Sequence, residues 1–289
     1  MECLPNPLYP TGTKEYWRNL KDQLNTYFNE DPATTPQLAV PVRITEHILN
    51  QQWSHHPSSP QHAAKADLIN IAFYFLLRVG EYTKPRNSKT KTIPFRIQDI
   101  TFRNQQGHII PNTAPLINLL SAAEATISIP NQKNGTKGQC IHHKATHTIH
   151  CPIKSLARRV YHIMSQGGTI NTPIYCYRTP FKTAWQQVPA NAINHVLKQA
   201  AGDIGLYTLG YSSSDVSSHS LRAGGAMAMH LNGISTTTIQ KIGRWRSPTF
   251  LHYIHEQISA FSDGVSIKMS QDIAFRNIAG PSITQAAAA

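Results

Sequence analysis

The chain has 289 residues, and its 27 lysines and arginines against 15 aspartates and glutamates give a formal net charge of +12 at pH 7. Hydrophobic residues make up 40% of the chain, which is enough to bury a sizeable core and excludes disorder throughout. The excess of positive charge makes a polyanion the first partner to expect. The longest apolar stretch, residues 68–77, is too short to span a membrane, so we expect no membrane partner.

The N-terminus and the cysteine content indicate an intracellular protein. The first ten residues, MECLPNPLYP, lack the basic start and the continuous apolar segment of a secretory signal. Four cysteines are too few to cross-link a chain of this length, and we expect them to be free thiols. They are Cys3, Cys140, Cys151 and Cys176.

Six potential zinc ligands fall within twelve residues, which raises the alternative of a structural metal site. They are Cys140, His142, His143, His147, His150 and Cys151. Zinc sites usually present two close pairs of ligands separated by a folded spacer, whereas these residues lie in one continuous polar stretch. We therefore favour a strand end followed by a loop, and no metal.

Helices are expected where apolar residues repeat every three to four positions. In chain order they cover residues 14–28, 44–53, 63–79, 152–165, 191–201, 218–232, 235–242 and 248–259. Residues 63–79 are apolar nearly all round in their centre, which indicates a helix inside the core with Arg78 near its end. Ser235 and Ser247 are expected N-caps, and Gly233 lies just past a helix end.

Short alternating runs predict β-structure in the middle of the chain. Residues 93–102 and 107–111 form two such runs. Residues 125–130 and 139–143 form a further pair, joined by a turn that contains Asn134 and Gly135, a strong hairpin signal. The expected fold class is therefore mainly α with a small antiparallel β-sheet (α+β).

A basic motif begins the helix expected at residues 218–232. His219 and Arg222 are three residues apart and so share one helix face in the first turns. The free amides and the positive end of the helix dipole favour a phosphate there. The AGGA that follows permits close backbone approach, or alternatively plain helix packing.

Three other basic or hydroxyl-bearing positions accompany this motif. Tyr253 follows Arg222 by 31 residues and lies on the flank of an apolar helical stripe, so its hydroxyl can face a cleft. Arg78 precedes Glu81, a carboxylate that can orient a guanidinium. Lys133 and Lys137 lie in the expected hairpin loop.

The signatures of nucleotide-binding loops, serine hydrolases and zinc proteases are absent from the sequence.

Taken in order, these residues resemble the tyrosine recombinase (phage integrase) family. The resemblance covers about residues 40–279 and is strongest in LLRVGEYT, HSLRAGGA and IGRWRSPTFLHYI. It implies a catalytic domain with the fold shared by type IB topoisomerases, over residues 39–280. Residues 1–38 would then be an N-terminal segment, a possible remnant of a DNA-binding (core-binding) domain, and residues 281–289 a tail.

The resemblance also implies phosphoryl transfer without metal, ATP or any other cofactor. Arg78 and Arg222 would stabilise the charge that gathers on the phosphate oxygens. Tyr253 would attack phosphorus and form a covalent 3′-phosphotyrosyl intermediate. Lys133 would protonate the leaving 5′ oxygen, with Lys137 as the alternative acid. His219 would contact the phosphate or help Tyr253 to lose its proton.

One position departs from the family pattern. Nine residues before the nucleophile the family commonly has His or Trp, whereas this chain has Arg244 followed by Trp245. Either Arg244 contacts the phosphate and Trp245 packs, which we favour, or Trp245 is shifted by one and supplies the hydrogen bond. Glu81 would be the supporting carboxylate. Further DNA contacts are expected from Lys84, Arg86, Lys137 and Arg246.

These features predict a site-specific recombinase or integrase that acts on double-stranded DNA as a homotetramer in the synaptic complex. The alternatives are a type IB topoisomerase-like enzyme that relaxes DNA, and a DNA-binding relative that has lost catalysis. A DNA-associated protein of this kind would reside in the cytoplasm of a prokaryote or the nucleus of a eukaryote.

Overall fold

The computed structural model describes residues 38–54, 59–85, 92–131, 137–148, 150–180 and 182–245. The chain divides into two units, residues 1–36 and 37–289, and all described residues belong to the second. The helices expected at 14–28 and 248–259, with Ser247, and the Asn134–Gly135 turn lie outside the described residues.

The described part of the chain contains six helices of eight or more residues and three shorter ones. They are α2 Val42–Ser54, α3 Pro60–Tyr74, α4 Val79–Tyr82, α5 Leu116–Leu120, α6 Pro152–Ser165, α7 Ala190–Ile204, α8 Leu206–Leu209, α9 Ser218–Leu231 and α10 Thr236–Gly243. The predictions for α2, α6, α7, α9 and α10 are confirmed, α6 with identical bounds. The short helices α5 and α8 were not predicted. None of the described helices is long and apolar enough to cross a membrane.

Four strands form a small antiparallel sheet. They are β1 Ile100–Arg103, β2 Ile109–Ile110, β3 Glu124–Ile129 and β4 Gln139–Lys144, in the order β2-β1-β3-β4. The hairpin register places Ile127 opposite Ile141. A second, two-stranded sheet pairs β5 Cys176–Tyr177 with β6 Gln186–Gln187. The predicted fold class, mainly α with a small antiparallel sheet, is confirmed.

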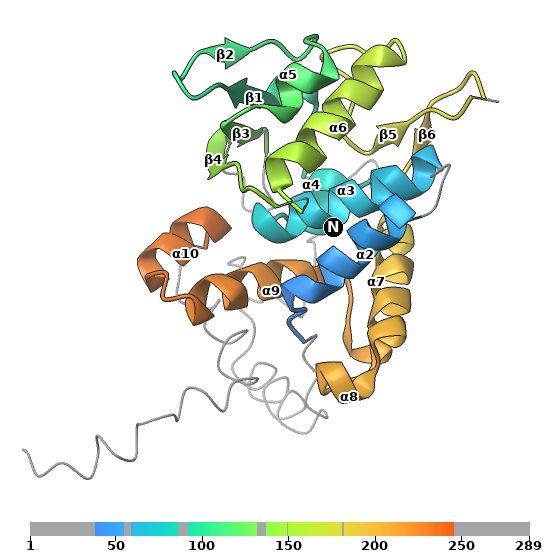
Figure 1. Cartoon of the computed structure of the whole chain (residues 1–289), viewed down its shortest axis with the longest axis vertical. Helices are drawn as coiled ribbons and strands as arrows, with labels where there is room; N and C mark the ends of the chain where they lie inside the picture. The colour runs from blue at the N-terminus through green and yellow to red at the C-terminus, as the bar shows by residue number, and fades with distance from the viewer. Residues whose placement is uncertain are drawn as a thin grey trace, which may run out of the picture. The chain divides into compact units, whose positions relative to one another are not determined.

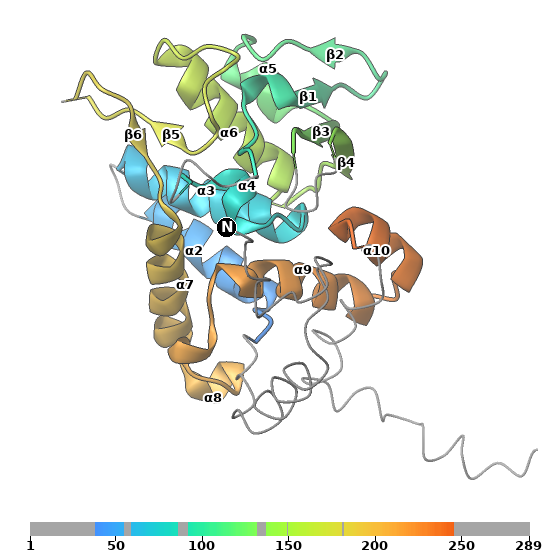
Figure 2. The same cartoon turned by 180° about the vertical axis from the view of Figure 1, so that it is seen from behind.

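Helix α3 runs through the middle of the fold. Figures 1 and 2 show the four-stranded sheet, α5 and α6 together on one side of α3, and α2, α7 and α9 on the other side of α3. Ser59 caps the N-terminus of α3 by accepting a hydrogen bond from the Gln61 N–H, and Pro60 occupies the first turn of this helix. Leu68, Ile69 and Ile71 are fully buried. Burial on all sides explains why this segment is apolar nearly all round.

The end of α3 differs from the prediction. The helix was expected to reach residue 79, but it ends at Tyr74 because Leu76 adopts a left-handed backbone conformation with φ of 47°. Arg78 consequently does not end a long apolar helix. It lies at the N-cap position of α4, where the chain has already turned.

Helix α9 approaches its neighbours at its two adjacent glycines. A Cβ on Gly224 would lie 2.0 Å from the Val40 carbonyl oxygen, and one on Gly225 would lie 2.3 Å from the Phe73 carbonyl oxygen. The Val40 N–H also donates a hydrogen bond to the Ser220 carbonyl at 3.2 Å. The small residues of AGGA therefore allow α9 to pack directly against the backbone of the segment before α2 and of α3.

Candidate active site

The carbonyl oxygen of Leu76 joins two arginines that come from distant parts of the chain. Nη1 of Arg222, in α9, donates a hydrogen bond to it. Nη2 of Arg244, at the end of α10, donates to the same oxygen at 3.2 Å. The second terminal nitrogen of Arg222 donates to the Gly243 carbonyl. The left-handed turn after α3 thus exposes a backbone acceptor that positions both guanidiniums.

A buried carboxylate, Glu81, connects a third arginine to this group. Glu81 Oε1 lies 3.2 Å from Nη1 of Arg78, and Oε2 accepts a hydrogen bond from the Arg78 backbone N–H at 2.8 Å. Oε2 also accepts a hydrogen bond from Nη2 of Arg244 at 2.7 Å. Glu81 therefore contacts the guanidiniums of Arg78 and Arg244, and Arg222 joins them through the Leu76 carbonyl that it shares with Arg244. Three guanidiniums and one carboxylate leave an excess of two positive charges. Such an excess at a partly dry site favours an anionic ligand.

The three arginines differ in exposure. The Arg78 side chain is 25% exposed, whereas those of Arg244 and Glu81 are 2% and 0% exposed. Burial lowers the pKa of Arg244, and the neighbouring Glu81 opposes that shift. Nε and Nη1 of Arg244 have no hydrogen-bond partner among the described residues. Unsatisfied buried donors of this kind are expensive to keep, which indicates a role beyond packing.

Trp245 lies against the guanidinium of Arg222. The distance from Arg222 Cζ to the centroid of the indole ring is 4.2 Å, the geometry of a cation–π contact. The same ring covers Gly243, where an added Cβ would fall 1.6 Å from a ring carbon. The indole and the two backbone carbonyls together fix the plane of the Arg222 guanidinium.

His219 lies at the N-terminus of α9, one turn before Arg222. Ser217 caps this helix by accepting a hydrogen bond from the His219 N–H at 3.2 Å, as the expected helix start requires. Oδ1 of Asn194, in α7, accepts from the Ser218 N–H at 2.7 Å. His219 is exposed, whereas Arg222 is only 6% exposed. His219 therefore lies at the edge of the site and Arg222 in its interior.

The structure therefore brings together Arg78, Glu81, Arg222, Arg244 and Trp245. Lys84 and Lys137 are exposed, and the Lys84 N–H donates to the Val188 carbonyl at 2.9 Å. Four expected site residues lie outside the described residues: Arg86, Lys133, Arg246 and Tyr253. Sequence reasoning missed the carbonyls of Leu76 and Gly243, because a backbone acceptor leaves no signal in residue type. It also missed Asn194.

The polar stretch weighed as a zinc site has other contacts. His142 Nδ1 lies 2.8 Å from Thr126 Oγ1, and the His143 ring packs edge-on against Phe75. Cys151 Sγ accepts a hydrogen bond from the Thr146 N–H at 3.2 Å. Across the described residues, no group of three or more His, Cys, Asp or Glu could hold a metal ion.

Comparisons with known proteins identify the fold. No family model and no curated protein matches the chain. Among solved structures, the XerH site-specific recombinase bound to a palindromic difH substrate aligns with a TM-score of 0.51 at 16% identity, over 81% of this chain and 54% of XerH. The XerA recombinase aligns with 0.49 at 14% identity, covering 83% and 67% of the two chains. The Tn1549 transposon integrase aligns with 0.44 at 11%, covering 88% and 77%.

The alignment with XerH carries the fold assignment. This chain has the fold of a tyrosine recombinase catalytic domain, as the resemblance predicted. It spans about half of the length of XerH.

Proposed function

We propose that the chain is a DNA-cleaving and DNA-rejoining enzyme, a site-specific recombinase or integrase that acts through a 3′-phosphotyrosyl intermediate at Tyr253. The observation that carries this proposal is one connected group of three arginines: Arg78 and Arg244 contact the buried Glu81 carboxylate, and Arg222 and Arg244 share the Leu76 carbonyl. A DNA phosphodiester supplies the negative charge that this group lacks. The XerH fold supports the same class of reaction.

In the proposed reaction the Tyr253 oxygen attacks phosphorus, and the bond between phosphorus and the 5′ oxygen breaks. The phenol proton leaves with the help of His219, and Lys133, or alternatively Lys137, donates a proton to the leaving oxygen. The phosphate remains bound to the tyrosine, so the reverse attack by a 5′ hydroxyl restores the strand and the phenol. No step consumes a nucleotide or needs a cofactor.

The arginines act on the charge of the transition state. Pentacoordinate phosphorus places more negative charge on the nonbridging oxygens than the ground state does, and prepositioned guanidiniums stabilise the difference. Arg78 is the most exposed of the three and is the first to meet a bound phosphate. The Glu81 carboxylate accepts hydrogen bonds from both the backbone N–H and the guanidinium of Arg78. Arg78 is therefore already positioned, and little reorganisation is needed when DNA binds.

The proposed partner is double-stranded DNA, with a homotetramer forming when two duplexes are brought together. Lys84, Arg86, Lys137 and Arg246 are the proposed additional contacts to its backbone. Counterion release predicts that DNA binding weakens steeply as salt is raised. A DNA affinity that does not change with salt would contradict this basic binding surface.

A suicide DNA substrate, nicked so that the cleaved strand is lost, tests the proposal. The wild-type chain is expected to become covalently attached to the DNA, visible as a slower band on a denaturing gel. Tyr253→Phe is expected to abolish the adduct and to keep DNA binding, while Tyr207→Phe, an exposed tyrosine of α8, serves as the matched control.

Three outcomes of this experiment are informative. The absence of an adduct with wild-type protein on its cognate DNA would overturn the enzymatic proposal and leave a DNA-binding protein. An adduct that survives in Tyr253→Phe would move the nucleophile elsewhere. Relaxation of supercoiled DNA by a monomer, without exchange between duplexes, would assign a type IB topoisomerase activity instead.

A further inference from the structure

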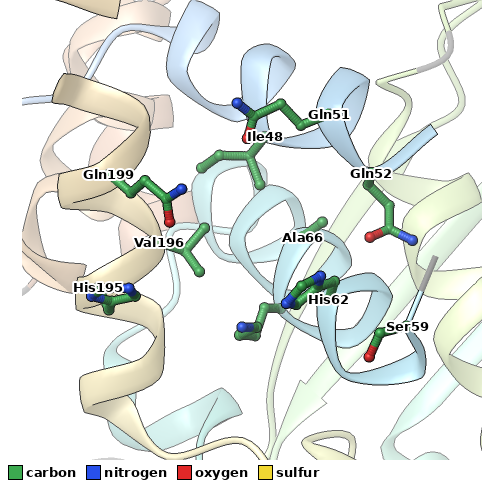
Figure 3. Close-up of a pocket in the computed structure, with 10 residues that line it drawn as sticks. Ile48, Gln51, Gln52, Ser59, His62, Ala66, His195, Val196 and Gln199 are labelled. Atoms are coloured by element: carbon green, nitrogen blue, oxygen red, sulfur yellow. The ribbon is translucent and has the colours of Figure 1, made fainter. Parts of the chain in front are cut away.

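A cavity of about 560 Å³ opens between α2, α3 and α7, and none of its lining residues belongs to the arginine group. Figure 3 shows the side chains of these helices arranged around it. Lys65 precedes Tyr74, the last residue of α3, by nine residues, so it lies about 14 Å along the helix axis from the end of α3, where the turn to Leu76 begins. The lining residues are Ile48, Gln51, Gln52, Ser59, His62, Lys65, Ala66, His195, Val196 and Gln199.

Among the described residues that line the cavity, Lys65 carries the only ammonium or guanidinium group, and none carries a carboxylate. Within the described part of the chain, the Lys65 ammonium has no ion-pair partner. Burial lowers the pKa of Lys65, as expected for an ammonium that has lost part of its hydration without gaining an opposite charge. Asp203 contacts the lining residue Gln51 at 3.1 Å but does not itself line the cavity. The charge that an entering ligand meets first is therefore that of Lys65.

The polar groups of the cavity suit a planar heteroaromatic ring as well as an anion. The side chains of Gln52, Gln199 and His195 make no hydrogen bond to other described residues. An amide offers a donor and an acceptor side by side, the pattern that pairs with the edge of a nucleobase. Ile48, Ala66 and Val196 provide an apolar surface against which the face of a ring can pack. The volume lies within the range of typical small-molecule sites.

We infer that this cavity binds a nucleotide, with the phosphate at Lys65 and the base between Gln52, Gln199 and the apolar wall. The nucleotide is either free in solution or a unit of a bound DNA strand. The inference goes beyond the proposed cleavage, in which no lining residue takes part, and only the DNA-strand source of the nucleotide rests on the proposed DNA partner. The ligand would bind reversibly, without any covalent step.

Calorimetric titration of the full chain tests the inference, with adenosine 5′-monophosphate, inorganic phosphate and adenosine as separate probes. Wild-type protein is expected to bind the monophosphate more tightly than either of its parts. Lys65→Gln is expected to weaken monophosphate and phosphate binding by about tenfold or more, the loss of one charge-assisted contact. Gln199→Leu is expected to weaken adenosine binding and leave phosphate binding intact.

Lys198→Gln is the matched control, since Lys198 is an exposed lysine of α7 that does not line the cavity. It removes the same charge and should leave all three affinities unchanged. Nuclear magnetic resonance of the His62 and His195 imidazoles gives a second readout, which should shift when the monophosphate is added. Two results would overturn the assignment. One is equal monophosphate binding by wild-type protein and Lys65→Gln, and the other is that wild-type protein gives neither a binding heat nor a resonance shift with the monophosphate.

A competition experiment separates the two sources of the nucleotide. If the site takes a unit of a DNA strand, adenosine 5′-monophosphate will displace a labelled DNA duplex, and Lys65→Gln will weaken duplex binding. If the site takes a free nucleotide, the monophosphate and the duplex will bind independently. The nucleotide-binding measurements need no strand cleavage. A negative result in them would therefore not affect the suicide-substrate result, and a negative suicide-substrate result would not affect the nucleotide-binding measurements.

Discussion

The Arg244 guanidinium lies 2.7 Å from the Glu81 carboxylate, although 163 residues separate the two in the chain. Both side chains are buried, and Glu81 contacts Arg78 as well. A single carboxylate thus fixes the relative positions of α4 and the end of α10.

Glu81→Gln should destabilise the fold by about 3 kcal/mol or more, because it leaves the buried Arg244 charge without its counter-charge. Urea unfolding measures this change. Glu124→Gln, which alters a carboxylate that is 31% exposed and 3.9 Å from His142, is the control and should be close to neutral. Equal stability of both variants would show that Glu81 does not neutralise Arg244.

The double variant Glu81→Gln with Arg244→Gln separates stability from chemistry. Replacing both members of a buried ion pair removes the unpaired charge, so much of the lost stability should return. Cleavage of the suicide substrate should stay low, since one guanidinium near developing charge contributes about 3 kcal/mol. Full recovery of cleavage together with stability would mean that Arg244 serves the fold alone.

Trp245→Leu should slow cleavage about tenfold by releasing the Arg222 guanidinium from the indole face, a contact that contributes about 1–2 kcal/mol. Trp245→Phe should have a smaller effect, because a phenyl ring binds cations less strongly than an indole does. Trp185→Leu is the matched control, since that ring lies 4.8 Å from Arg178. Single-turnover cleavage rates that fall equally in Trp185→Leu and Trp245→Leu would contradict a specific effect on Arg222.

Gly224→Ala should destabilise the fold by about 3 kcal/mol, because the added methyl group meets the Val40 backbone and α9 must move away. Gly202→Ala, in α7, has no atom within 4 Å of the new Cβ, and it should be neutral or stabilising by up to about 1 kcal/mol. Thermal or urea unfolding compares the two. Equal effects would place the requirement for glycine in helix propensity rather than in close packing.

His162 should make the fold sensitive to acid. Burial, with a smaller contribution from Arg159, lowers its pKa to about 4, and Nε2 accepts a hydrogen bond from the Arg178 N–H at 3.1 Å. The folded pKa lies below the ordinary 6.5, so the unfolded chain binds the proton more tightly. The stabilising contribution is therefore complete above about pH 6.5 and is lost as the pH falls toward 4.

Urea unfolding at pH 7 and at about pH 5 measures this contribution, which should amount to about 1 kcal/mol because solvent screens a partly exposed imidazole. His162→Gln should lose less stability than wild type over this interval, whereas His108→Gln, an exposed histidine, should behave like wild type. An identical pH dependence in wild type and His162→Gln would show that His162 does not titrate in this way.

Patterns local in the chain were enough to predict several helices and one strand pair. Helix α6 has its predicted bounds, and Ser235 and Gly233 mark helix ends as expected, because capping hydrogen bonds and turn conformations involve residues near one another in the chain. The β3–β4 pairing also followed from alternation around a short turn.

The arginine group, in contrast, depends on contacts between distant parts of the chain. The left-handed turn at Leu76 ends α3 early, and its carbonyl then receives Arg222 and Arg244. Helix propensity alone favours a longer α3 that continues through this apolar segment. In the structure the chain turns at Leu76, where Gly225 of α9 packs closely against the Phe73 backbone. The burial of Arg244 likewise depends on Glu81, a partner that local pattern cannot reveal because the contact forms only when α4 and α10 meet.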